Sequence, residues 1–440
     1  MRIPLTLALL VIVVPSALGL EAGAFAVDIT PIVEPFDDAN GNQLRDPTET
    51  FTDTDGDGRH ATAWLAGFRM GRAAQSVHDP LWARAVVVRD GKTVIAWVAL
   101  DLVGYLFHRV AATQEALERE LGIPRAHVLV ASTHTHHAPD AIGIWGPRVG
   151  TSGIDDAYLD RVDAACREAV RGAFARLRPA RVAQAIAPAG DLARDSREPK
   201  VIDPDLVAMR FTDAETRATI ATVAIYGCHP EVLWSKNQAV TSDFPHYLRT
   251  ALERDLGGVS VFFAGALGGL ITPNAGGHDF DRCLAMGEEL AARFRRALEG
   301  AALEDARLAV ATGVVEFPLA NLMFRIAMGA GMLPASERMI RKPSGEILLP
   351  IEVGAFALGD TTVLACPGEL FPELGIAGKA RVASRRAAII GLANMELGYI
   401  VPPDAWSWRN YEETMSAGKA VAPILQRAWL DRLRALDRLK

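Results

Sequence analysis

The chain has 440 residues, of which 50% are hydrophobic and 22% are charged. Such a composition is globular and excludes a disordered or collagen-like chain. Acidic residues outnumber basic ones by 53 to 46, and no block of Lys and Arg interrupts the sequence. The electrostatic pattern of a nucleic-acid-binding protein is therefore absent. The length fits two or three domains, or one large α/β domain.

The N-terminal residues have the pattern of a secretory signal peptide. A basic start at Arg2 precedes an apolar run over residues 3–14, and the small residues Ala17 and Gly19 suit cleavage. The run is too short to span a bilayer as a helix, and the alternative is a buried N-terminal helix. We expect residues 1–19 to be a signal peptide and the mature protein to be secreted or periplasmic. In that oxidising compartment four cysteines could pair, in combinations that the sequence leaves open: Cys166, Cys228, Cys283 and Cys366.

Apolar strands and amphipathic helices alternate along the rest of the chain. Apolar runs predict strands at 23–30, 84–88, 93–103, 127–132, 221–226, 259–264 and 361–365. Apolar residues at three- and four-residue spacing predict helices at 110–121, 156–177, 244–255, 284–298 and 421–439. This order indicates an α/β fold, a layered sandwich with buried central strands flanked by helices.

The chain contains no long repeat and no Pro/Ser linker, so we expect one catalytic domain over residues 20–440. Its last helix is expected to pack on this domain. A role at a membrane surface is the minor alternative for that helix, because its charges are mixed rather than basic.

An acidic loop over residues 36–60 repeats a short pattern of oxygen-bearing side chains with glycine at the turns. A loop of this kind wraps a hard cation such as Ca²⁺. Neither copy is a complete EF-hand loop, because the first has Gln43 at its sixth position and the second has Trp64 at its twelfth, although Glu49 closes the first. We expect structural calcium here, with a plain solvated turn as the alternative. The candidate ligands are Asp38, Asn40, Asn42, Asp53, Asp55 and Asp57.

Four predicted strands run into residues that can bind a metal. They lead to His134 with His136, to His229, to Glu369 and to Tyr399. In α/β sheets the ligand site lies beyond the carboxyl ends of the strands, so these side chains are expected to converge. Imidazole and carboxylate form a zinc ligand set, and an open position on zinc lowers the pKa of a water molecule to about 7. The sequence therefore predicts a zinc site at the strand ends.

Three short motifs carry a resemblance to a known family: Thr133-His134-Thr135-His136, His229-Pro230 and Pro367-Gly368-Glu369. Together they resemble the N-terminal catalytic domain of the neutral/alkaline non-lysosomal ceramidase family, zinc amidases that hydrolyse the N-acyl bond of ceramide. The similarity runs from Ala22 to Tyr411. It implies that His136 is a substrate-side partner and that Tyr411 polarises the amide carbonyl. It also implies four zinc ligands, namely His134, His229, Glu369 and Tyr399.

The chain departs from the family at three places. Where the family has Gly-Asp-Val-Ser-Pro-Asn around its nucleophile, this chain has Leu270 for the Asp and Thr272 for the Ser. The family's Ser-Gly-Pro-Gly after the histidine pair is replaced by residues 137–140, which read His-Ala-Pro-Asp. From its length we also expect this chain to lack the C-terminal immunoglobulin-like domain of the long family members.

From these residues we expect an exported zinc amidohydrolase that cleaves an N-acyl, ceramide-like amide, which would place it in sphingolipid or other lipid metabolism. An activated water would attack directly or act as base toward Thr272, and His136 and Tyr411 would stabilise the oxyanion. A zinc esterase or other hydrolase, and a non-catalytic zinc-containing binding protein, are the alternatives. The expected partner is a lipid or N-acyl small molecule, with peripheral contact to a membrane as an option and no protein partner evident.

Overall fold

A computed structural model describes residues 19–439. The apolar run of the expected signal peptide lies outside the described residues. Two sheets organise the fold. The larger one has the order β11-β9-β8-β6-β1-β3-β4-β5. Its strands, in chain order, are β1 (Leu20–Asp28), β3 (Trp82–Asp90), β4 (Thr93–Leu100), β5 (Val128–Ser132), β6 (Arg178–Pro188), β8 (Asp205–Asp213), β9 (Thr219–Tyr226) and β11 (Val259–Ala264).

The second sheet has the order β13-β15-β16-β18. It contains β13 (Leu308–Pro318), β15 (Ile347–Leu358), β16 (Thr361–Ala365) and β18 (Arg386–Ile390), and β14 (Ile340–Arg341) pairs with β15 at its start. Three short ladders complete the strands: β2 (Ser76–Val77) with β10 (Ala239–Val240), β7 (Ala193–Asp195) with β12 (Ile271–Pro273), and β17 (Glu369–Leu370) with β19 (Tyr399–Ile400).

The larger sheet is mixed. Its outermost pairs, β9 with β11 and β4 with β5, are parallel, whereas the inner neighbours are antiparallel. A two-residue turn joins β3 to β4, and such a connection produces an antiparallel hairpin. The parallel pairs are linked through helices, as a crossover requires.

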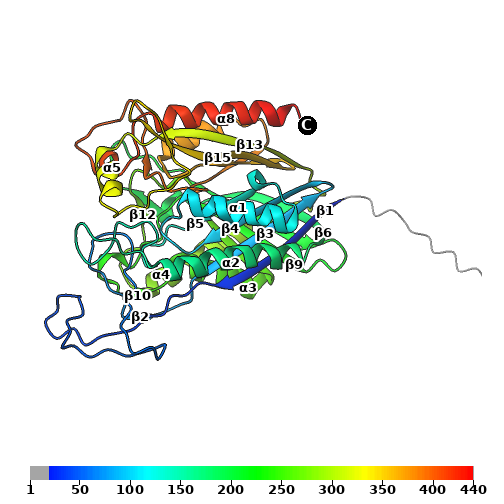
Figure 1. Cartoon of the computed structure of the whole chain (residues 1–440). Helices are drawn as coiled ribbons and strands as arrows, with labels where there is room; N and C mark the ends of the chain where they lie inside the picture. Colours follow the sequence, from blue (N-terminus) through cyan, green and yellow to red (C-terminus); the bar gives the residue numbers. More distant parts are fainter. Residues whose placement is uncertain (1–18, 440) are drawn as a thin grey trace, which may run out of the picture.

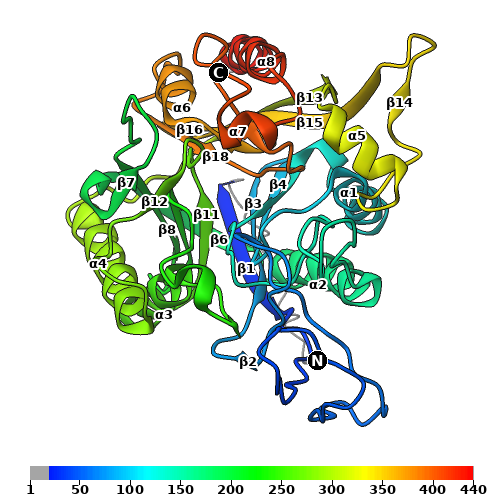
Figure 2. The ribbon, with the colours of Figure 1, turned by 90° about the vertical axis from the view of Figure 1, so that its left-hand side faces the viewer.

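Helices cover the outer face of each sheet, so the fold has four layers (Figures 1 and 2). On the larger sheet lie α1 (Phe107–Leu121), α2 (Asp156–Phe174), α3 (Phe244–Leu256) and α4 (Phe280–Leu298). On the second sheet lie α6 (Pro372–Lys379) and α8 (Val421–Asp437). Two further helices, α5 (Leu322–Gly329) and α7 (Tyr411–Thr414), lie near one end of the strands (Figure 2).

The two sheets pack face to face through a shared apolar core. Trp97 of β4 is fully buried there, and its ring meets Phe263 of β11 and Phe356 of β15 edge-on at centroid distances of 6.5 and 5.9 Å. Edge-on contacts of this kind are favourable because the positive ring edge meets the negative face. The predicted layered α/β sandwich with buried central strands is therefore confirmed.

Most predicted elements occur where the apolar pattern placed them. The strands at 259–264 and 361–365 match β11 and β16 to the residue, and the last helix packs on the second sheet through Leu425, Trp429 and Leu433. No prediction was made for β6, β8, β13 and β15. β13, for example, has half-buried and exposed positions along most of its length, and Gly313 and Thr312 separate its short apolar runs at 308–311 and 314–315.

The four cysteines are all buried with free thiols, so the expectation that they could pair is not met. Cys166 lies in α2 and Cys283 in α4, whereas Cys228 and Cys366 follow different strands. Each side chain fills part of an apolar core and has no second cysteine to reach. Of the helices in residues 19–439, none has the length and apolar character needed to cross a bilayer.

Candidate metal centre and its pocket

Two histidines and one glutamate meet at the ends of the strands. His134 follows β5, His229 follows β9, and Glu369 begins β17 just after β16. All three side chains are buried. His229 Nε2 lies 3.1 Å from Glu369 Oε2, and His134 Nε2 lies 3.5 Å from the same oxygen. The strand ends thus bring together residues that are 235 positions apart in the chain, as the sequence predicted.

Backbone carbonyls hold both histidine rings. His134 Nδ1 donates to the carbonyl of Val103, and His229 Nδ1 donates to the carbonyl of Ile271 at 2.7 Å. A neutral imidazole that donates from Nδ1 carries a lone pair on Nε2. Two nitrogen lone pairs and a carboxylate oxygen therefore face one another, and only a shared proton or a metal cation can hold such acceptors together. The backbone carbonyl behind each ring is the usual support of a metal-binding histidine.

The charges in the cluster are strongly coupled. Burial by itself would lower the pKa of His134, but the carboxylate of Glu369 raises it above its usual value. Burial would likewise raise the pKa of Glu369, but His134 and His229 hold it well below its usual range. Glu369 is thus a carboxylate in a buried place where a positive charge is favoured.

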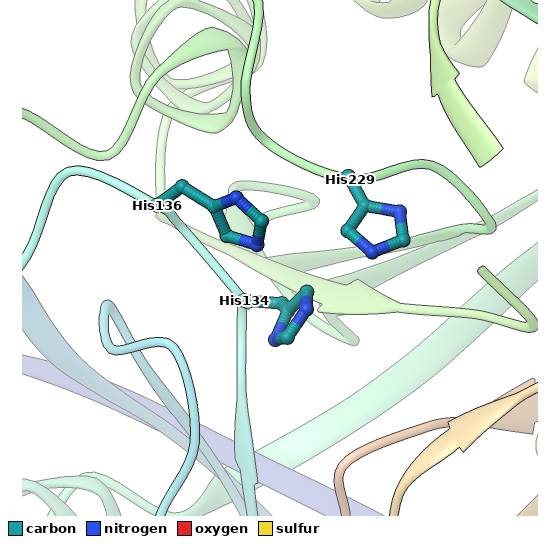
Figure 3. A group of neighbouring side chains, drawn as sticks. All are labelled: His134, His136 and His229. Atoms are coloured by element: carbon teal, nitrogen blue, oxygen red, sulfur yellow. The ribbon is translucent and has the colours of Figure 1, made fainter. Parts of the chain in front are cut away.

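His136 is the third histidine of the group. Its ligand atom and those of His134 and His229 lie within 4.8 Å of one another, and Figure 3 shows the three rings around a common point. Its Nδ1 lies 3.0 Å from the carboxylate of Glu231, a residue that the sequence analysis did not single out. Burial lowers the pKa of His136 to about 4, so the ring is neutral near pH 7. With Glu231 on Nδ1, the nitrogen available to the group is Nε2.

Two tyrosines complete this side of the site. Tyr399 stands opposite Glu369 in the parallel ladder of β17 and β19. Burial and the charge of Glu369 raise the pKa of Tyr399 well above its usual value. Tyr411 begins α7, its ring centroid lies 6.0 Å from that of Tyr399, and its pKa is raised to about 12, mainly by burial. Both phenols are therefore protonated near pH 7 in the absence of a metal.

Thr272 lies next to the cluster but does not line the pocket that contains it. It follows Ile271 in β12, whose carbonyl holds the His229 ring, and its hydroxyl is buried without a hydrogen-bond partner. Leu270, two positions before Thr272, has a φ of 60°, in the left-handed region that costs energy for a leucine. His134 shares this feature with a φ of 68°. Strained backbone of this kind concentrates at functional sites.

A buried arginine ties the loops of the site together. Arg72 donates to the carbonyls of Ala66, Gly67 and His136, and also to Nδ1 of His137. Burial lowers its pKa to about 10, still far above neutral, so the charge persists. Nothing in the sequence marks this arginine, because its partners are carbonyls from separate loops.

Gly67 allows the His136 ring to approach the backbone. A Cβ built on Gly67 would lie 2.5 Å from Cγ of His136, and the residue has a φ of 79°. Both the contact and the left-handed conformation require glycine at this position.

An apolar pocket lies beside the candidate metal cluster. Its empty space is about 980 Å³ when the open solvent at its mouth is counted, and its wall includes His134, His136, Glu369, Tyr399 and Tyr411. The remaining wall is mostly apolar, with contributions from Val103, Leu106, Phe107, Ile142, Ile144, Trp145, Leu319, Phe324, Met328, Leu333, Met339, Leu349, Met395, Leu397 and Met415. Such a pocket suits a ligand with one polar group near the cluster and a long apolar part.

Two acidic residues of the pocket region were also missed. Asp140 is buried, and its carboxylate accepts the backbone N–H groups of Ile142, Gly143, Trp145 and Gly153. It thereby holds the loop that supplies part of the pocket wall. Glu396 lines the pocket itself; Oε1 accepts the N–H of Gly398, Oε2 is buried without a partner, and burial raises its pKa well above the usual value.

The two copies of the acidic loop differ. In the first, Asp38, Asn40 and Asn42 accept backbone N–H groups of residues 42–44, and Glu49 accepts those of Ala39 and Asp46. In the second, Asp53, Asp55 and Asp57 likewise accept backbone N–H groups of residues 56–59. The difference is that the carboxylates of Asp53 and Asp55 also lie with that of Glu34, all within 4.8 Å. Glu34 lies outside the repeated pattern, which is why the sequence did not predict it.

No family model matches the sequence, and no curated protein matches it. Solved structures match its fold. A neutral ceramidase from Pseudomonas aeruginosa has a TM-score of 0.76 at 18% identity, over 96% of this chain and 75% of that one. A ceramidase complexed with C2 has a TM-score of 0.74 at 18% identity, over 96% and 76%. The fold is that of these ceramidase structures.

Gly67→Ala should displace His136 and destabilise the protein. We expect the free energy of unfolding to fall by roughly 2–4 kcal/mol, because a strained φ and an overpacked contact add together. The matched control is Gly300→Ala, since Gly300 has a φ of 74° with no atom near its added Cβ. Urea unfolding of both variants checks this. Equal losses would mean that the His136 contact carries no cost.

Proposed function

We propose that this protein is an exported zinc-dependent hydrolase that cleaves the amide bond of a lipid-like N-acyl compound, with one catalytic domain over residues 20–440. The observation that carries the proposal is the meeting of His134, His229 and Glu369 acceptors beside an apolar pocket whose wall includes His134 and Glu369. The ceramidase-like fold supports an amide as the substrate, and ceramide itself is the first compound to test.

The residues present fit zinc. His134, His229, Glu369 and Tyr399 offer two nitrogens and two oxygens, a set that zinc accepts, and the two rings have the backbone support that metal-binding histidines have. When bound, zinc would supply a Lewis acid that polarises the amide carbonyl and makes water more acidic.

The chain's own residues divide the other tasks. The apolar wall binds the acyl or alkyl chain and excludes water. Tyr411 donates a hydrogen bond from its phenolic O–H to the oxygen of the amide carbonyl as that oxygen gains negative charge. The nucleophile's oxygen forms a bond to the carbonyl carbon, and the C–N bond then breaks.

His136 moves the proton in this scheme. Nε2 takes the proton of the nucleophile, and the resulting imidazolium is stabilised by Glu231 at 3.0 Å. It then gives the proton to the departing amine. This role differs from the oxyanion contact expected for His136 from the sequence. It follows from the carboxylate of Glu231, 3.0 Å from Nδ1, which favours the ring proton on that nitrogen and leaves Nε2 as an acceptor.

Zinc content should depend on the proposed ligands. Purified protein is expected to hold about one equivalent of zinc, and His134→Ala and His229→Ala should each lose most of it. His108→Ala is the matched control, because His108 lines the pocket away from the cluster. His136→Ala should keep zinc and lower kcat by roughly 10²–10⁴ on an N-acyl substrate.

Metal analysis and product detection by mass spectrometry check these expectations. Full zinc in both ligand variants would refute the metal site. Paired amide and ester substrates separate the amidase from a zinc esterase. A zinc-loaded protein that turns over neither would be a binding protein.

Thr272 should contribute to the chemical step. Its hydroxyl is buried without a hydrogen-bond partner, and the carbonyl of the preceding residue, Ile271, accepts the hydrogen bond from the His229 ring. Thr272 also occupies the position at which the resemblance implies the nucleophile of the ceramidases. We expect Thr272→Val to lower kcat and kcat/KM together by about a hundredfold with zinc retained, and Thr272→Ser to keep most activity. Steady-state kinetics on the N-acyl substrate, with metal analysis, measures this. Wild-type turnover in Thr272→Val would leave water as the nucleophile.

We also propose structural calcium at Glu34, Asp53 and Asp55. Three carboxylates within 4.8 Å repel one another, so a cation that binds only the native state should raise the melting temperature. Asp53→Asn should abolish the rise, whereas Asp38→Asn should keep it, because Asp38 accepts backbone N–H groups as Asp53 does but lies outside the group of three carboxylates. The melting temperature, measured with added calcium, with added magnesium and with a chelator, tests this expectation. An unchanged midpoint would identify a solvated turn.

A further inference from the structure

One segment beside the pocket mouth has apolar residues on both of its sides. This segment, the α5 arm, comprises residues 322–346, which include α5 and β14 (Figure 2). Phe324 and Met328 line the pocket, whereas Leu322, Met323 and Ile326 on the same helix are 65%, 67% and 54% exposed. A short surface helix normally turns its large apolar residues toward the core. The outward side of α5 therefore lacks the apolar partner that its composition favours.

The arm repeats this arrangement in its second half. Met339 lines the pocket, and the next residue, Ile340, is among the exposed large apolar residues. Tyr411 also lines the pocket while being 54% exposed, and Trp408, three positions before it in the chain, is 63% exposed. Segments that line the apolar pocket thus carry exposed aliphatic and aromatic side chains, and a group of this kind marks an interaction surface.

The arm is also basic, although the whole chain has an acidic excess. Residues 322–346 contain Arg325, Arg338, Arg341 and Lys342 against Glu337 and Glu346. Arg325 and Arg341 border one shallow groove together with Leu322 and Ile326. Arg338 pairs with Glu115 and Lys342 pairs with Glu346, so the unneutralised cations are the two in the groove.

We propose that the α5 arm docks on a bilayer that contains anionic phospholipid, with Leu322, Met323 and Ile326 among the acyl chains and Arg325 and Arg341 at the phosphates. Basic residues next to exposed aliphatic ones are the combination that binds proteins to the interface of such membranes. A second copy of the chain fits less well, because a two-fold interface would bring the same cations together. Docking here would turn the pocket mouth toward the bilayer, so that an apolar substrate could enter without crossing water.

The first experiment measures binding without any turnover. The full chain is sedimented with vesicles of phosphatidylcholine alone or of phosphatidylcholine with phosphatidylglycerol. We expect wild-type protein to bind the mixed vesicles and to be released by added salt. Leu322→Ser/Ile326→Ser and Arg325→Gln/Arg341→Gln should each bind at least about tenfold more weakly.

Matched controls remove the same chemistry elsewhere. Leu284→Ser/Leu303→Ser replaces exposed leucines in α4 and in the segment after it, and Arg434→Gln/Arg438→Gln removes two charges at the end of α8. Both controls should bind like wild type. All variants have the same N-terminus, so the apolar run at residues 3–14 contributes equally to each.

The second experiment reports on the arm alone. The four native cysteines are buried, so a thiol-reactive environment-sensitive fluorophore can be directed to Met323→Cys, with Leu284→Cys as control. Mixed vesicles should shift the emission of the label on the arm to shorter wavelength and leave the control unchanged.

The proposal is overturned if wild-type protein does not bind mixed vesicles, or if the arm variants bind as the controls do. Equal emission shifts at the two labelled positions would also overturn it. So would a dimer that the arm variants dissociate while vesicle binding is unchanged. None of these readouts needs hydrolysis, so a protein that docks but cleaves no amide would refute the proposed function and leave the docking surface standing.

Discussion

Two hydrogen bonds from histidine rings to backbone carbonyls determine the chemistry of the site. Val103 and Ile271 accept the Nδ1 protons of His134 and His229, which turns both Nε2 lone pairs toward Glu369. Val103 follows the end of β4 and Ile271 is the first residue of β12. The orientation of both histidine rings therefore depends on where these two strands end and begin. The buried acceptors repel one another unless a cation or proton lies between them. The folded protein therefore favours the binding of a positive charge at this place.

The supporting loops extend this constraint outward. Arg72 binds carbonyls of two loops, Gly67 makes room for the His136 ring, and Asp140 gathers four backbone N–H groups to shape the pocket wall. Arg72 and Asp140 are buried polar groups satisfied mainly by backbone, an arrangement that fixes loops without a hydrophobic core of their own. The result is a rigid polar end on a pocket whose other walls are apolar and rich in methionine, a side chain that adapts to irregular ligands.

The α5 arm gives the pocket an outer surface of a different character. Its inward residues belong to the pocket and its outward residues resemble the face of an interfacial helix. The proposed docking would therefore make the same short segment both a wall of the pocket and a contact with the bilayer. If the substrate is an apolar N-acyl compound, this continuity joins the place where it is stored to the place where it is cleaved.

The sequence by itself determined the layered α/β class, the positions of the most apolar elements and the residues that end their strands. Apolar runs report burial on both faces directly, so β11 and β16 were found to the residue. His134, His136, His229 and Glu369 were found because each lies at a strand end in a recognisable order. Only the tertiary structure decided the rest. β13 is a half-buried strand that is recognised by its pairing with β15. Glu231, Arg72 and Glu34 each contact groups that are distant in the sequence. Local patterns register the burial of a residue, but the identity of its neighbour depends on how the sheets stack.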